Sequence, residues 1–226
     1  MKYFELLEKL HSVKDEKFAV FQRKLIFTRQ TILGVRTPLL RKIAKEYRGE
    51  IHSLMAFPDE YYEVTFIKLA IVSSLPYEQF VLWLEQCLLR VDNWATCDCF
   101  KAKCILENKD DFLQKLQRVY ALDNLYAKRY VLVTMLSYYM DEEYLETAME
   151  YARKTPTDEY YLHMAVAWLT AEIVIKHFDV GVEFLKEKAL SPKTHNKAIQ
   201  KAIESYRLNK EQKEILRSLK IKNNVR

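Results

Sequence analysis

A tryptophan and an aspartate stand one helical turn apart near the middle of the chain, in Trp94-Ala95-Thr96-Cys97-Asp98. On a helix, Trp94 and Asp98 share a face, and Lys101 follows along it. A preorganised carboxylate can stabilise positive charge, and a flat indole can contact a ligand beside it. The alternative is a solvated carboxylate with a tryptophan at the rim of the core, because such pairs are common on helices.

Two polar residues in front of this tryptophan mark the expected start of a helix. A short polar side chain accepts hydrogen bonds from the free amides of a first turn, so Asp92 or Asn93 is predicted to cap it. The helix is predicted over residues 92–107, with Cys97 and Phe100 on an apolar stripe. The tryptophan and the aspartate are therefore not needed to build the core.

The cysteines crowd into eighteen positions of the chain: Cys87, Cys97, Cys99 and Cys104. Cys97 and Cys99 are two residues apart, which on a helix points them in different directions, a poor geometry for a shared metal or a disulfide. We expect reduced core cysteines, as in a cytosolic protein, with no metal site and no cofactor.

Helical periodicity continues along the whole chain, and no alternating strand pattern competes with it. The predicted helices cover residues 2–13, 15–28, 37–47, 58–73, 76–90, 92–107, 109–119, 124–140, 141–153, 157–177, 179–188, 192–206 and 210–220. Thr37 is expected to cap the third helix, with Pro38 at its first position. Pairs of helices repeating every roughly 35–45 residues are typical of helical-repeat proteins. We therefore expect an all-α solenoid of antiparallel helix pairs, one domain over 1–226, with a concave face made by one helix of each pair.

Composition excludes several classes of protein. A chain of 226 residues that is half hydrophobic can bury a substantial core and is not disordered. Three glycines and five prolines are too few for a sheet protein rich in tight turns or for a glycine-rich phosphate loop. The N-terminus has an amphipathic pattern rather than that of a signal peptide, and no apolar run has membrane-spanning length. We expect a cytoplasmic protein without a membrane span.

Charge is unevenly distributed along the chain, whose net charge is +5. Residues 17–48 carry an excess of +8 and residues 197–226 an excess of +6, whereas residues 49–196 sum to −8. Two basic ends, the second including a basic C-terminal end at about 207–226, suit a polyanion that touches both ends of a curved body. The alternative is two solvated helix faces and a basic tail.

Two further residues stand out in apolar helices. Arg129 lies in Tyr126-Ala127-Lys128-Arg129-Tyr130-Val131, and an arginine there needs a carboxylate or a phosphate as a partner. Trp168 follows an apolar run that begins at Tyr160, and its alternative role is simple core packing. His163 has no companion with metal-ligand spacing, so no site is assigned to it.

Four segments, taken in order, carry a resemblance: Leu33-Gly34-Val35-Arg36-Thr37-Pro38-Leu39-Leu40-Arg41-Lys42-Ile43-Ala44, then Asp92-Asn93-Trp94 with Asp98, then Lys128-Arg129, and then Ala167-Trp168. The set resembles the DNA alkylation repair family of HEAT-like-repeat DNA glycosylases and covers nearly the whole chain. No single motif is highly specific, whereas the ordered set is fairly so. The resemblance implies a HEAT-like-repeat fold with a basic concave face that grips duplex DNA.

The resemblance also implies roles for residues of this chain. Asp98 would support cleavage of the N-glycosidic bond of purines alkylated at N3 or N7. The implied DNA contacts are Trp94, Arg129, Trp168, Lys101, Lys128, Arg36 and Arg41. The implied partner is duplex DNA with alkylated purines, bound by a monomer at the nucleoid in base excision repair, with no metal or cofactor.

Departures from the family pattern leave a second function open. A basic pair expected before Trp168 is replaced by His163-Met164, and Leu169-Thr170-Ala171 stands where an arginine is expected. An aromatic residue expected upstream of Gly34 corresponds to Leu25 or Phe27. The alternative to a glycosylase is a module without chemistry that binds distorted or branched DNA, or a protein partner.

Overall fold

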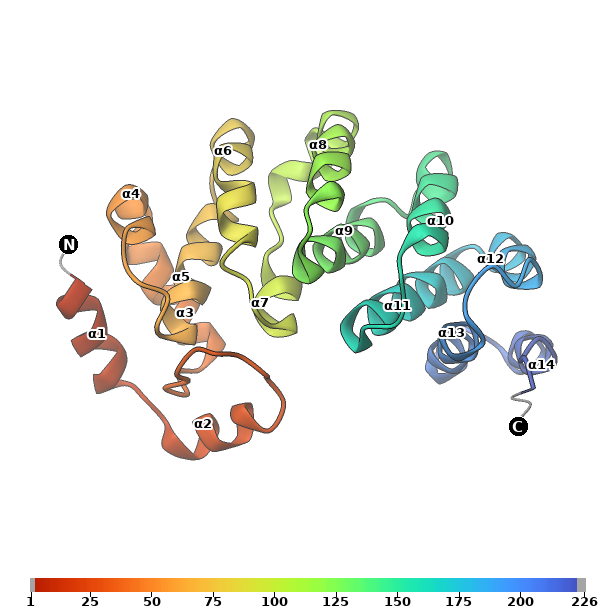
Figure 1. The fold of residues 1–226 in the computed structure, drawn as a ribbon, viewed down its shortest axis with the longest axis horizontal. Coiled ribbons are helices and arrows are strands. Elements are labelled where there is room, and N and C mark those ends of the chain that lie inside the picture. The colour runs from red at the N-terminus through yellow and green to blue at the C-terminus, as the bar shows by residue number, and fades with distance from the viewer. Residues whose placement is uncertain (1–2, 223–226) are drawn as a thin grey trace. The chain divides into compact units, whose positions relative to one another are not determined.

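The protein is built mainly from helices, and the structure, a computed structural model, describes residues 3–222 (Figure 1). The predicted all-α helical-repeat class is confirmed. Within this range there is no strand, only an isolated bridge between Thr31 and Tyr61. None of the described helices is both long and apolar enough to span a bilayer. Residues 223–226 of the basic C-terminal end lie outside the described residues.

The helices, in chain order, are α1 (Tyr3–Ser12), α2 (Glu16–Arg23), α3 (Thr37–Glu46), η1 (Arg48–Glu50), α4 (Ile51–Met55), α5 (Tyr62–Val72), α6 (Tyr77–Leu88), α7 (Trp94–Cys99), η2 (Lys103–Glu107), α8 (Lys109–Ala121), α9 (Leu125–Tyr138), η3 (Glu142–Tyr144), α10 (Leu145–Lys154), α11 (Tyr160–Lys176), α12 (Phe178–Lys186), α13 (Pro192–Glu204) and α14 (Lys210–Ser218). The elements marked η are short 3-10 helices. Contacts divide the chain into two compact units, unit 1 (Met1–Phe112) and unit 2 (Leu113–Arg226). The expectation of a single domain over 1–226 stays a prediction.

Unit 1 is built around α5, which packs against α3, α4, α6 and α7. Neighbours on several sides require a helix that is apolar nearly all round, and α5 buries ten of its eleven residues. Two of the buried residues are charged, Glu63 and Lys68. Their partners therefore have to come from inside the unit, since an unpaired buried charge is very costly.

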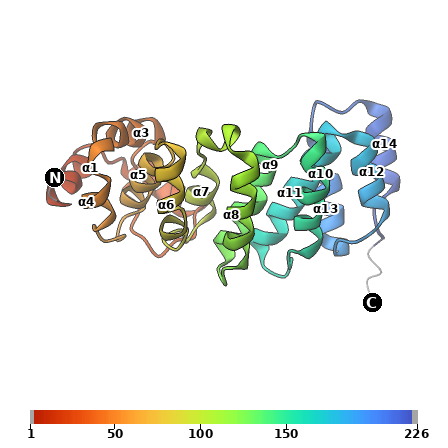
Figure 2. The same cartoon turned by 90° about the horizontal axis from the view of Figure 1, so that it is seen from above.

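Unit 2 is built around α11, which packs against α9, α13, α12 and α10. Helices α9, α11 and α13 lie side by side in this unit (Figure 2). The end of the unit is closed by apolar residues of α11 to α14, among them Val174, Leu185, Ile199 and Leu216. As in unit 1, the central helix is apolar on most sides, which explains its lack of an amphipathic pattern.

The prediction of one helix over residues 92–107 is wrong. α7 ends at Cys99, and Phe100 and Ala102 have non-helical backbone angles before η2 begins. Phe100 and Ala102 are both buried, whereas Lys101 between them is exposed. The chain turns at Phe100, where the amide of Lys101 donates to the carbonyl of Cys99, and this break in the helix lets both apolar neighbours be buried. Lys101 consequently does not continue the face of Trp94 and Asp98.

Other helix boundaries also differ from the predicted ones. The helix predicted from Pro58 begins only at Tyr62, because the preceding residues pair with Thr31 through Thr31 N to Glu60 O and Tyr62 N to Thr31 O. Thr37 is not a cap, since Arg36 occupies the cap position without a side-chain bond. The short helices η1 and α4 were not predicted, and α2 ends earlier than the prediction of 15–28.

The segment between α2 and α3 is irregular but is held by buried contacts. The carboxylate of Glu63 accepts hydrogen bonds from the amides of Leu33, Gly34 and Val35, at 2.8–3.2 Å. Gly34 has φ +84°, and a Cβ there would lie 2.2 Å from the carbonyl oxygen of Asp15. A glycine is therefore required at this position both by conformation and by space.

Candidate functional site

The helix that carries Trp94 and Asp98 begins at a well-formed cap. The buried Asn93 side chain accepts a hydrogen bond from the amide of Thr96 at 3.0 Å. Of the two predicted candidates, Asn93 is therefore the cap. Its side chain also donates to Asp92 at 2.9 Å, so the cap is itself held in place.

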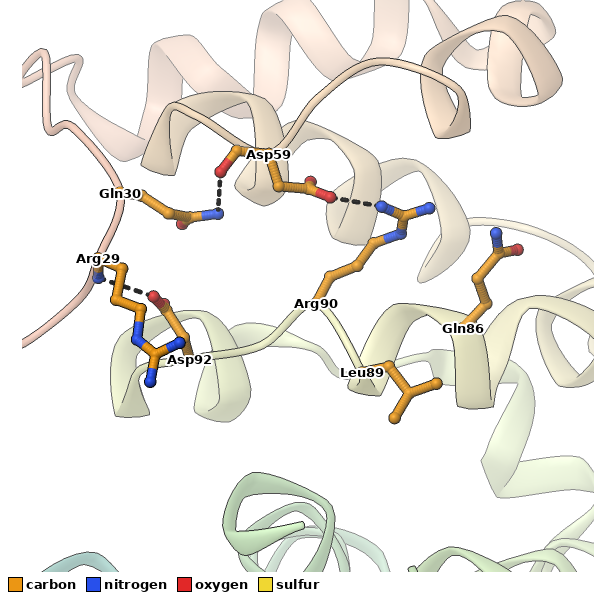
Figure 3. A pocket seen from close by; sticks show the side chains of 7 residues that line it. All are labelled: Arg29, Gln30, Asp59, Gln86, Leu89, Arg90 and Asp92. Carbon is orange, nitrogen blue, oxygen red and sulfur yellow. Dashed lines mark hydrogen bonds and ion pairs between the residues drawn. The ribbon is translucent and has the colours of Figure 1, made fainter.

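Asp92 has a different role from the one considered for it. Its carboxylate accepts from the hydroxyl of Thr28 at 2.7 Å and from the amide of Arg29 at 2.9 Å. These bonds join the start of α7 to a segment more than sixty residues earlier. The Asp92–Arg29 bond is one of those drawn in Figure 3.

Trp94 and Asp98 occupy α7 one turn apart, as predicted, and both side chains are partly exposed. The indole Nε1 of Trp94 donates to the carbonyl of Leu25 at 2.9 Å. This hydrogen bond fixes the orientation of the indole, and the ring stays partly exposed to solvent. The arrangement offers a carboxylate next to an oriented indole.

The cysteines around this site are free thiols. The expectation of core cysteines holds for Cys87 and Cys97, but it is wrong for Cys99, which is exposed, and Cys104 is half-buried. Burial of its sulfur nevertheless raises the pKa of Cys99. A raised pKa keeps the thiolate fraction low, so Cys99 is a poor nucleophile. No group of potential metal ligands occurs among residues 3–222.

The basic residues assigned to DNA in unit 1 differ in their surroundings. Arg36 is exposed, forms an ion pair with Asp15 at 3.0 Å and lies over the Phe18 ring at 3.8 Å. Arg41 is exposed on α3, with its guanidinium 5.7 Å from the centre of the Phe66 ring. Charge is therefore available to solvent at both positions.

Arg129 in unit 2 is 5% exposed and lies on α9. Its Nη1 donates to the backbone carbonyl of Tyr161 at the start of α11, at 2.7 Å. The sequence predicted a carboxylate or a phosphate as the partner of Arg129. In the structure, one hydrogen-bond partner of the guanidinium is this main-chain carbonyl. Lys128 next to it is partly exposed.

Trp168 on α11 is 41% exposed, so simple core packing does not account for it. His163, five residues earlier, is 3% exposed, and its Nδ1 lies 2.9 Å from the hydroxyl of Thr194. Burial lowers the pKa of His163, and the charges of Lys193 and Lys197 lower it further. His163 therefore belongs to the interior of unit 2, whereas Trp168 is accessible to a ligand.

The predicted site residues divide between the two units. Trp94, Asp98, Lys101, Arg36 and Arg41 belong to unit 1. Arg129, Trp168 and Lys128 belong to unit 2. The structure brings Trp94 and Asp98 together on α7, and the convergence of these two with Arg129 and Trp168 on one concave face stays a prediction.

A polar pocket of about 510 Å³ lies in unit 1 and was not predicted (Figure 3). Its lining residues are Arg29, Gln30, Asp59, Gln86, Leu89, Arg90 and Asp92. The sequence feature that could have indicated a buried polar group here is Lys68, a charged residue in the largely apolar helix α5. Lys68 is 1% exposed, and its Nζ donates to Asp59 at 2.9 Å.

The charged groups around Asp59 at this pocket are paired with one another. Asp59 forms ion pairs with both Lys68 and Arg90. Burial by itself raises the pKa of Asp59, but hydrogen bonds and charge from Lys68 and Arg90 outweigh it and lower the pKa. Gln30 donates to the Asp59 carbonyl at 3.0 Å and to Thr65 at 2.6 Å. The group is a structural network of ion pairs and hydrogen bonds inside unit 1.

The fold and the α7 site define a helical protein with a partly exposed carboxylate and indole on one helix and a basic N-terminal region. A family model described as DNA alkylation repair enzyme matches residues 6–205. The chain belongs to this family, and a role in the repair of alkylated DNA follows from that membership.

Solved structures show the same fold. One is a predicted DNA alkylation repair enzyme from Enterococcus faecalis, with a TM-score of 0.58 and 16% sequence identity. The match covers 84% of this chain and 95% of that one. No curated protein matches the chain.

Proposed function

We propose that the protein is a monofunctional DNA glycosylase that releases purines alkylated at N3 or N7 from duplex DNA. The observation that supports this most directly is the α7 site, where Asp98 and Trp94 are partly exposed on one face of a capped helix. Membership of the DNA alkylation repair family supports the same class of substrate.

The chemistry follows from the lesion. Alkylation at N3 or N7 makes the purine cationic and a good leaving group, and breaking its N-glycosidic bond moves positive charge onto the sugar. The carboxylate of Asp98 stabilises that charge and orients the water that attacks the sugar. The indoles of Trp94 and Trp168 contact the deoxyribose and the strained nucleotide, and Arg129 binds a neighbouring phosphate.

The decisive experiment is single-turnover release of 7-methylguanine from duplex DNA, run beside a binding titration. Asp98→Asn keeps the shape of the side chain and removes its charge. Excision should fall by roughly a hundredfold or more with little change in affinity, because the lost interaction belongs mainly to the transition state. An Asp98→Asn variant as fast as an active wild type would refute the role of Asp98. Absence of release by the wild type would refute the glycosylase for this lesion.

A second candidate is a DNA-binding module of the same fold without catalysis. The surroundings of Trp168 favour it, because His163-Met164 and Leu169-Thr170-Ala171 stand where basic residues are expected. All of them are buried except Met164, which is partly exposed. None of these side chains offers a phosphate the positive charge of the basic residue expected there. This module would bind distorted or branched duplexes and release no base.

A further inference from the structure

A second pocket, of about 470 Å³, lies in unit 2 and is lined by four lysines, Lys186, Lys188, Lys220 and Lys222. The first two stand at the C-terminal end of α12, and the other two follow α14, which lies next to α12 at the end of the unit (Figure 2). None of the described residues that line the pocket carries a carboxylate. Its volume is in the range of sites that bind small molecules. We call it the lysine pocket.

The ion pairs of this region leave most of the lysine charge unpaired. Glu187, next to the pocket in sequence, binds Arg153, with Oε2 at 3.0 Å from Nε. Lys186 has a carboxylate partner, Glu183, at 2.7 Å. The other three lysines form no ion pair with any residue that the structure describes. The pocket therefore has positive charge that the fold does not use.

The segment after α14 is held against α13 by hydrogen bonds. The Asn196 side chain accepts from the amide of Ile221 at 2.9 Å and donates to the carbonyl of the same residue at 2.8 Å. The buried ring of His195 donates through Nε2 to the carbonyl of Leu219 at 2.9 Å. The backbone is therefore fixed on both sides of Lys220, and a ligand does not have to order this segment when it binds.

Lys188 has a backbone conformation that usually selects glycine. Its φ is +53°, and its amide donates to the carbonyl of Leu185 at 3.1 Å, just beyond the last turn of α12. Glycine is the usual residue at such a helix end, because it has no Cβ to clash in the left-handed conformation. A lysine here lowers stability relative to glycine, which indicates that its side chain has a role other than folding.

The alternative is that the lysines only balance the negative C-terminal ends of α12 and α14. Each helix end carries about half an elementary negative charge, less than the charge of the three lysines without a carboxylate partner. A multivalent anion accounts for the rest, and lysine is a common ligand of phosphate. The phosphates of a duplex lie on a convex surface, whereas a short chain of linked phosphates can enter a pocket.

We propose that the lysine pocket binds a small oligophosphate, an anion with two or three linked phosphate groups. The lysine Nζ atoms donate hydrogen bonds to phosphate oxygens. The partly exposed side chains of Leu219 and Ile221, which also line the pocket, contact a nucleoside where the anion is a nucleotide. The site shares no residue with the α7 site, and the proposal does not depend on glycosylase activity.

The test is isothermal titration calorimetry of the full chain with inorganic triphosphate, in a low-salt buffer that contains a chelator. The wild type should bind a single anion per chain. Lys220→Ala should weaken binding by roughly tenfold or more, because a hydrogen bond between charged groups contributes that much. The control is Lys210→Ala, which removes the same charge from an exposed position of α14 outside the pocket and should bind like the wild type.

Lys188→Gly separates binding from stability. It removes an ammonium group from the pocket and places glycine where the backbone favours it. The affinity for triphosphate should fall by roughly tenfold, whereas the temperature of unfolding should not fall. Unchanged affinity in Lys188→Gly and Lys220→Ala would refute the proposal. Equal losses in Lys210→Ala and Lys220→Ala would also refute it, because they would show attraction by net charge alone.

Two further arms identify the source of the phosphates. Equal affinity for adenosine triphosphate and inorganic triphosphate would assign the site to the phosphate chain itself, and tighter binding of adenosine triphosphate would add the nucleoside contact. The second arm measures the affinity of the same variants for a duplex. Absence of triphosphate binding by the wild type, with weaker duplex binding by Lys220→Ala, would overturn the proposal and assign the lysines to DNA. Failure to release 7-methylguanine refutes the glycosylase but leaves this test intact.

Discussion

The indole nitrogen of Trp94 donates a hydrogen bond to the backbone carbonyl of Leu25, although the two residues are 69 positions apart. The bond joins the helix that carries Asp98 to the connection between α2 and α3. Together with the hydrogen bonds that Thr28 and Arg29 donate to the carboxylate of Asp92, it connects these two parts of unit 1. A change in the connection is therefore expected to affect the α7 site.

The first prediction concerns Glu63, which is fully buried under that connection. Glu63→Ala leaves the amides of Leu33, Gly34 and Val35 without their acceptor. We expect the free energy of unfolding to fall by about 3 kcal/mol or more, measured by urea denaturation, because each unsatisfied buried amide costs about 1–3 kcal/mol. Glu78→Ala, at an exposed position of α6, is the control and should change stability by less than about 0.5 kcal/mol. Equal stability of the two variants would contradict the buried role of Glu63.

The second prediction concerns Arg129. Arg129→Ala should weaken duplex binding and also slow base release, because a phosphate contact operates in both ground and transition states. It should also lower stability, since it removes the hydrogen bond to the Tyr161 carbonyl. Arg129→Lys keeps the charge but not the forked geometry and should lie between the wild type and the alanine variant. Unchanged affinity in a folded Arg129→Ala variant would contradict the phosphate contact.

The third prediction concerns pH and His163. Its folded pKa lies below the unfolded value of 6.5, so the unfolded state binds more protons in the window just below pH 6.5. Stability contributed by this group is present above pH 6.5 and is lost as the pH falls toward the folded pKa. Thermal unfolding between pH 7.5 and 5.5 should show a smaller loss for His163→Asn than for the wild type. The control is His11→Asn at an exposed position, which should show the same pH dependence of stability as the wild type.

The fourth prediction concerns the basic regions. If residues 17–48 and the C-terminal lysines and arginines contact phosphates, binding weakens steeply with salt because counterions are released. The dissociation constant for a duplex should rise at least tenfold between about 50 and 200 mM salt. A flat salt dependence would instead favour a protein partner.

The sequence was sufficient for the helical class and for the pairing of Trp94 with Asp98. Both depend on short-range periodicity, since residues four apart on a helix share a face whatever the rest of the chain does. The cap could be narrowed only to Asp92 or Asn93, because both side chains can accept from the first turn. The family resemblance was likewise readable, because it lies in short segments taken in order.

Tertiary structure decided where α7 ends and which contacts the residues on either side of it make. Phe100 and Ala102 are both buried in the core, so the helix ends at Cys99 and Lys101 leaves the predicted face. Asp92 accepts a hydrogen bond from Thr28 because the connection after α2 lies against the start of α7. No local sequence pattern predicts this contact. Local periodicity encodes faces of helices, whereas hydrogen bonds between residues more than sixty positions apart exist only once the chain has folded.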